Sequence, residues 1–179
     1  MAIGCGVLLV VIFAVSAAGK ARSRAAFDEF AGSLTELRLV PRRRRRPVAA
    51  AVIAVEAGLV ALFAVPGGAR LAFPAAAALL TVFAVAIEIT VRRGVRASCL
   101  CFGARSARPL DRVHVARNLV LAGVGALGLV AVTAPSPGDV HPAGAALAVA
   151  AAAVAAAVVL RLDDIAELFR PYPTLRQER

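Results

Sequence analysis

Residues 71–103, LAFPAAAALLTVFAVAIEITVRRGVRASCLCFG, join a long apolar run to an arginine-rich segment that carries two of the chain's three cysteines. The apolar part, Leu71 to Val91, has Glu88 as its only charged residue. A helix of about 20 apolar residues crosses the hydrocarbon core of a bilayer. This stretch therefore predicts a membrane-spanning helix followed by a short connection outside the hydrocarbon core.

The rest of the chain has the composition of the same class. Of 179 residues, 60% are hydrophobic, and the mean hydropathy is +0.80, above the range typical of soluble domains. We predict an all-α fold, a polytopic transmembrane helical bundle of four to five spans. Residues 1–134 form the predicted membrane domain, and residues 135–179 add a further span and a cytoplasmic tail. The predicted spans are 2–18, 48–65, 71–91, 116–134 and 143–160.

The basic residues predict the orientation. The formal net charge is +10, which in a soluble protein would suggest nucleic acid. Here all but one of the 21 Lys and Arg residues fall in the first connection, the cysteine-bearing connection and the C-terminal tail; the exception is Arg70. By the positive-inside rule, the N-terminus is outside and the C-terminus and cysteine pair are cytoplasmic. The prevalence of Arg over Lys favours a bacterial cell membrane.

A run of five arginines follows a segment with helical periodicity. The run consists of Arg42, Arg43, Arg44, Arg45 and Arg46. Because apolar spans flank it, we expect it to anchor the chain to anionic lipid and not to bind nucleic acid. In residues 21–40, Phe27, Phe30, Leu34 and Leu37 recur at three- and four-residue spacing. They predict an amphipathic helix, either on the membrane surface or packed on the bundle.

Cys99-Leu100-Cys101 is the strongest chemical motif. Nearby cations favour the reactive thiolate, and arginines occur on both sides of the pair. A disulfide across one intervening residue closes a small, strained ring that is easily reduced. We predict a redox pair, with two free loop thiols as the alternative. A zinc site with His114 would lack a fourth ligand, so we predict no metal and no cofactor.

Glu56 lies near the middle of the second predicted span. An ionisable residue at this depth is costly, and should face the bundle interior. It is either a neutral acid hydrogen-bonded between helices or the partner of Lys20 or Arg117, reaching in from the cytoplasmic end. Arg117 is alternatively a loop-end anchor or a thiolate stabiliser. The glycines between Gly123 and Gly128 predict close helix packing, not nucleotide binding.

Several of these residues, in this order, resemble the methylamine utilisation protein MauE family, within the wider DoxX-like group. The resemblance covers roughly residues 1–134. It is carried by Ala18-Gly19-Lys20, Val40-Pro41, Glu56, Cys99-x-Cys101-Phe102-Gly103 and Arg117-Asn118. It implies an integral membrane helper in methylamine metabolism, linked to maturation of methylamine dehydrogenase and acting on a thiol–disulfide partner protein. That maturation occurs outside the cytoplasm, whereas the charge distribution puts the cysteine pair inside. Either the pair takes electrons from cytoplasmic donors, or this homologue does something else.

Three functional hypotheses follow. The leading one is a thiol-redox or maturation helper in which Cys99 and Cys101 exchange, with Glu56, Arg117 and Lys20 in supporting roles. The alternative is a non-catalytic membrane scaffold that recruits a partner through its basic cytoplasmic face. A small-solute carrier that depends on Glu56, and not on the cysteines, is the third.

Overall fold

The computed structural model describes residues 1–38, 40–94, 112–135 and 141–168, with side chains as far as Arg161. Within these ranges the chain is helical and has no strand. Five helices are long and apolar enough to span a membrane. The predicted all-α membrane bundle is thereby confirmed, and the protein is a multi-pass membrane protein. The helices are α1 Ala2–Ala21, α2 Arg24–Glu36, the short 3-10 helix η1 Arg42–Arg44, α3 Arg45–Ala64, α4 Ala69–Arg92, α5 Arg112–Thr133 and α6 Pro142–Leu168.

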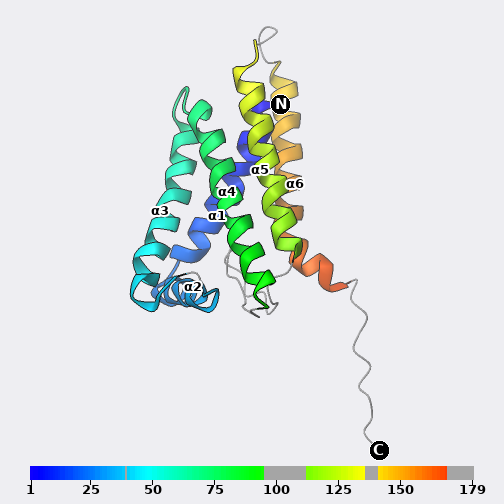
Figure 1. Ribbon diagram of the computed structural model, residues 1–179. Coiled ribbons are helices and arrows are strands. Elements are labelled where there is room, and N and C mark those ends of the chain that lie inside the picture. The colour runs from blue at the N-terminus through cyan, green and yellow to red at the C-terminus, as the bar shows by residue number, and fades with distance from the viewer. Residues whose placement is uncertain (39, 95–111, 136–140, 169–179) are drawn as a thin grey trace, which may run out of the picture.

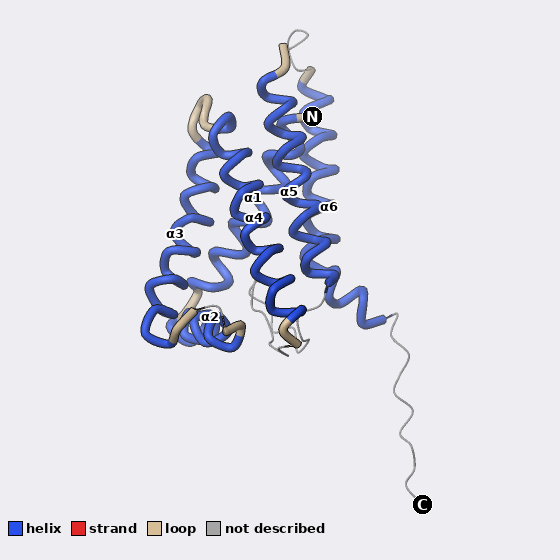
Figure 2. Tube along the Cα trace, viewed as in Figure 1, coloured by secondary structure: helices blue, strands red, loops and turns tan. Residues whose placement is uncertain are grey.

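The long helices stand side by side, and α2 lies across one end of the bundle (Figure 1). Helix α1 is the central element, because it packs against α3, α5 and α6, while α4 packs mainly against α5. Figure 2 shows that the described connections are short and lie at the ends of the helices. We call the end that holds residues 20–46, 88–94 and 112–118 the basic end. The other end, with the α3–α4 turn and the N-terminus of the chain, is the opposite end (Figure 1).

Helix α3 begins earlier than the apolar run that predicted it. It starts at Arg45 and so contains Arg46 and Pro47. The first N–H groups of a helix have no intrahelical partner, so a proline in the first turn costs no hydrogen bond. Arginine is also a good helix former. The helix therefore extends about one turn beyond the apolar residues, into the basic end.

The opposite end is held by close packing of apolar and small residues. Phe73, fully buried on α4, meets Phe63 edge to face with their ring centroids 5.0 Å apart. Gly128 of α5 faces the Phe73 ring so closely that a Cβ there would lie 2.2 Å from a ring carbon. Gly125 approaches the α4 backbone in the same way, whereas Gly123 faces open space. Close packing through the α5 glycines is confirmed for Gly125 and Gly128 but not for Gly123.

Helix α2 is packed on the basic end of the bundle. The Ser23 hydroxyl caps its N-terminus by accepting a hydrogen bond from the backbone N–H of Ala26 at 3.1 Å. Phe30 and Ala31 pack against Ala49 of α3. Beyond the helix, Leu37 forms a second cluster with Ile87 of α4. Packing of this amphipathic helix on the bundle is therefore observed, and its placement at the membrane surface stays a prediction.

Candidate functional site

The candidate site lies where the last turn of α1 meets the middle of α3. Ser16 and Lys20 are four residues apart, so they share one face of α1. Glu56 projects toward that face from α3, which packs directly against α1. The site is thus built from two helices whose packing brings together residues far apart in sequence.

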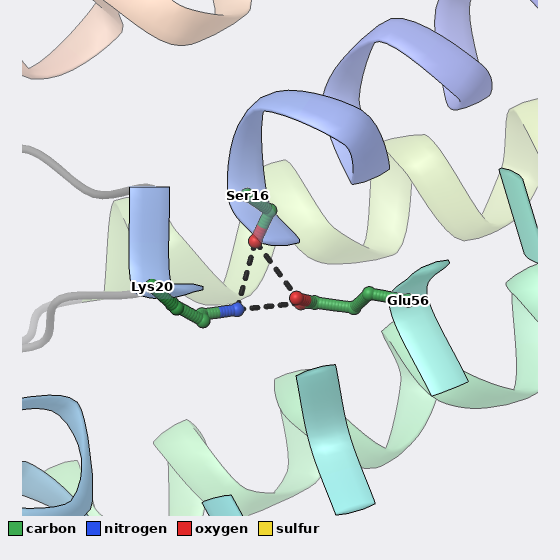
Figure 3. A network of polar contacts seen from close by, with 3 residues as sticks. All are labelled: Ser16, Lys20 and Glu56. Atoms are coloured by element: carbon green, nitrogen blue, oxygen red, sulfur yellow. Dashed lines mark hydrogen bonds and ion pairs between the residues drawn. The ribbon is translucent and has the colours of Figure 1, made fainter. Parts of the chain in front are cut away.

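The three side chains form a closed polar triangle (Figure 3). Lys20 Nζ donates to Glu56 Oε1 at 2.5 Å and to Ser16 Oγ at 2.8 Å. Ser16 Oγ in turn donates to Glu56 Oε1 at 3.0 Å. The hydroxyl therefore accepts from the cation and donates to the carboxylate, which keeps both charged groups fixed in one geometry.

The triangle is almost completely buried. The exposed fractions are 2% for Ser16, 3% for Lys20 and 1% for Glu56. Burying an unpaired charge in an apolar interior is strongly unfavourable, so each ionised group requires the other. Glu56 Oε2 is also buried and has no hydrogen-bond partner among the described residues. Because the hydrogen bonds from Lys20 and Ser16 both fall on Oε1, the second oxygen is the least satisfied atom of the site.

Two aromatic rings surround the ammonium group. Lys20 Nζ lies 4.8 Å from the ring centroid of Phe30 and 5.9 Å from that of Phe83. A ring face attracts a cation through its negative quadrupole, and the attraction grows when water is excluded. Phe30 belongs to α2 and Phe83 to α4, so the pair buried between α1 and α3 is contacted from two further helices. Helix α2 covers it from the basic end.

Further polar side chains are buried at the basic end on α4 and α5. They are Thr90, His114, Arg117 and Asn118. Two of them bond to a carbonyl one turn earlier in their own helix: Thr90 donates to Ala86 at 2.9 Å and Asn118 to His114 at 2.8 Å. Of the two partners predicted for Glu56, Lys20 is the one in the ion pair that the structure shows. Arg117 is buried on α5, and its predicted supporting role stays a prediction.

Cys99 and Cys101 lie outside the described residues. The helices that flank them are described: α4 ends at Arg92 and α5 begins at Arg112, both at the basic end. The predicted redox pair therefore stays a prediction, as does the expectation that these two cysteines hold no metal. Cys5 is a partly buried free thiol on α1, where it packs against the apolar core.

Sequence reasoning missed Ser16 and the aromatic rings around Lys20. Ser16 looks like an isolated small residue in an apolar run, but its spacing of four from Lys20 was a usable signal, because such residues share a helix face. Phe30 was predicted as part of an apolar stripe, without a contact to a cation. The contact from Phe83 depends on how α4 packs, which no local pattern reveals.

Comparison with known proteins shows the family to which the chain belongs. Residues 1–131 match the family described as "Methylamine utilisation protein MauE". The chain is also similar to "Methylamine utilization protein MauE" of Paracoccus denitrificans, with 37% identity over 116 residues, which is 64% of this chain and 61% of that protein. The chain thus matches about three fifths of the length of this curated relative. No solved structure matches it. Because the family match extends over most of the chain, including all of α1 to α4, the protein belongs to the MauE family.

Proposed function

We propose that this protein is a membrane thiol-redox or maturation helper for methylamine utilisation, and that Cys99 and Cys101 are its exchanging pair. The observation that carries the proposal is the arrangement of the basic end. The helices that flank the cysteine-bearing connection, α4 and α5, end and begin there. The buried Lys20–Glu56 pair lies within the same membrane domain, directly beneath α2. Membership of the MauE family connects this arrangement to methylamine utilisation.

The proposed chemistry is two successive thiol–disulfide exchanges. A cytoplasmic dithiol protein attacks the Cys99–Cys101 disulfide through a thiolate, forms a mixed disulfide, and is oxidised when its second thiolate displaces the chain's sulfur. The chain now holds two thiols. One of them attacks a disulfide of a partner protein that is reached from the cytoplasmic side, and the other resolves the mixed disulfide. Two electrons and two protons pass from the cytoplasmic donor to the partner's disulfide, and the Cys99–Cys101 bond is restored.

The charge distribution supports a cytoplasmic position for the basic end. Arg42 to Arg46, Arg92 and Arg112 lie at that end, because η1, α3 and α5 begin there and α4 ends there (Figure 1). The side that carries the excess of Lys and Arg faces the cytoplasm in most membrane proteins. We therefore propose a bacterial cell membrane protein with its N-terminus outside and its C-terminus inside. Residues 1–134 would be the functional domain, and α6 with the tail an addition to it.

A trapping experiment tests the exchange. Replacing the resolving cysteine by serine leaves the mixed disulfide without its second nucleophile, so an adduct to the partner accumulates. We expect one of the variants Cys99→Ser and Cys101→Ser to give such an adduct on non-reducing gels of membranes, and Cys5→Ser to behave as wild type. The Cys99→Ser/Cys101→Ser double variant should give none.

The scaffold hypothesis has its own observation, the exposed arginines of η1 and early α3. A scaffold recruits its partner through this face and has no use for the thiols. In a Paracoccus denitrificans strain that lacks its own MauE and is complemented by this chain, the double cysteine variant would then support growth on methylamine. If thiol exchange is the function, the double cysteine variant should not support growth on methylamine, although it is present in membranes at the wild-type amount.

A further inference from the structure

A cavity of about 530 Å³ lies at the basic end between α1, α2 and α3. Neither Lys20 nor Glu56 lines it, so it is separate from the buried ion pair. Its wall changes character along its length, from charged and polar residues to apolar ones. The lining residues are Ala21, Ser23, Arg24, Phe27, Arg46, Ala50, Ile53, Ala54 and Ala57.

The polar mouth of the cavity contains two arginines. Arg24 begins α2, and Arg46 lies in the first turn of α3. The Arg46 side chain is 65% exposed, and one of its terminal nitrogens contacts Asp28 Oδ1 at 2.8 Å. A guanidinium has five N–H donors, so this one contact leaves donors for a second acceptor. An exposed ion pair of this kind is also weak, which makes it easy to share or exchange.

The apolar wall runs up α3 from that mouth. Ala50, Ile53, Ala54 and Ala57 recur at three- and four-residue spacing, so they form one stripe along the helix. From Arg46 to Ala57 the helix rises about 16 Å, roughly half the thickness of the hydrocarbon core. The three alanines of this stripe are exposed in the structure. In a bilayer they therefore form a shallow, smooth-walled channel that opens sideways to lipid.

We propose that this cavity is a binding site for one anionic phospholipid. Its phosphate group would bind Arg24 and Arg46, and an acyl chain would lie along Ala50, Ala54 and Ala57. The argument is charge complementarity combined with shape: two cations at the membrane-interface end and an apolar channel leading into the hydrocarbon region match an amphiphile with a negative head. The site is more specific than general attraction of an anionic surface to the five-arginine run, since only Arg46 of that run lines it. It is independent of the thiol chemistry.

The charged half of the site is tested by native mass spectrometry of the purified protein in detergent, titrated with phosphatidylglycerol or phosphatidylcholine. We expect one phosphatidylglycerol to be retained in preference to phosphatidylcholine. Arg46→Gln and Arg24→Gln should each weaken phosphatidylglycerol binding about tenfold, the effect of losing one charge-assisted contact. Arg24→Gln leaves the Arg46–Asp28 ion pair in place, so its effect cannot come from that contact. Arg43→Gln is the matched control, because it removes the same charge outside the cavity.

The apolar half is tested by filling the channel. Ala54→Leu should weaken binding of both lipids, whereas Ala51→Leu, on an exposed face of α3 outside the cavity, should weaken neither. If Arg46→Gln and Arg43→Gln weakened phosphatidylglycerol binding equally, the proposal would be overturned. Binding would then come from general attraction of the anionic lipid to the five-arginine run. The proposal would also be overturned if the Ala54→Leu variant bound lipid as the wild type does. Two further results would contradict it: displacement of the lipid by inorganic phosphate at an equal concentration, and formation of a protein dimer in place of the lipid complex.

Discussion

The two ends of the bundle are stabilised in different ways. At the opposite end, helices α4 and α5 meet through glycine and phenylalanine, with Gly128 against the Phe73 ring. At the basic end, a lysine and a glutamate are buried together and covered by the aromatic rings of α2 and α4. Close packing is sufficient to join helices in lipid. A buried ion pair is not needed for that purpose, and this is why we place the proposed function at the basic end.

The largest expected effect comes from breaking the ion pair. Glu56→Ala leaves Lys20 buried without its counter-charge, which should lower the free energy of unfolding by about 3–5 kcal/mol. The free energy of unfolding is measured by titrating sodium dodecyl sulfate into mixed micelles and monitoring the helix content by circular dichroism. Lys20→Met/Glu56→Leu should recover most of the loss, because an apolar pair of similar size carries no buried charge.

Glu88 is the matched control for that experiment. It pairs with Arg92 one turn later at 2.7 Å, but the arginine is largely exposed. Glu88→Ala should therefore cost only about 0.3–0.5 kcal/mol. If Glu56→Ala lowers the free energy of unfolding no more than Glu88→Ala does, the buried ion pair contributes no more than an exposed one. The two ends of the bundle would then not be stabilised in different ways.

The next effect probes the opposite end. Gly128→Ala places a methyl group against the buried Phe73 ring, which must move, so we expect a loss of about 1–3 kcal/mol in the same unfolding assay. Gly123→Ala faces open space and should stabilise the helix by about 0.5–1 kcal/mol. Equal effects of the two substitutions would mean that this end does not depend on close approach of α4 and α5.

The smallest effect concerns Phe30, the nearer of the two aromatic rings that contact the Lys20 ammonium group. Phe30→Leu removes the ring nearest Lys20, and we expect a coupling of about 1 kcal/mol between the two residues. A double-mutant cycle measures it: Phe30→Leu should cost more in the wild-type protein than in the Lys20→Met/Glu56→Leu background. Identical costs in both backgrounds would assign Phe30 to apolar packing alone and separate α2 from the ion pair.

The helical architecture could be predicted from the sequence because apolar length alone decides which segments span a membrane. The helix ends could not, since Arg45, Arg46 and Arg92 continue the helices beyond the apolar runs. Glu56 was recognisable from the cost of a charge in mid-span. The choice of Lys20 as its partner, and the roles of Ser16 and Phe83, depend on how the helices pack, and local patterns do not encode that.

Labelling of Cys99 and Cys101 tests the central claim most directly. In a Cys5→Ser variant, which leaves only these two thiols, a membrane-impermeant maleimide is applied to intact cells and to inverted membrane vesicles, with and without prior reduction. A redox pair at a cytoplasmic basic end should label only in inverted vesicles and only after reduction. Labelling of intact cells from outside would contradict the cytoplasmic placement, and labelling of inverted vesicles without reduction would contradict a resting disulfide.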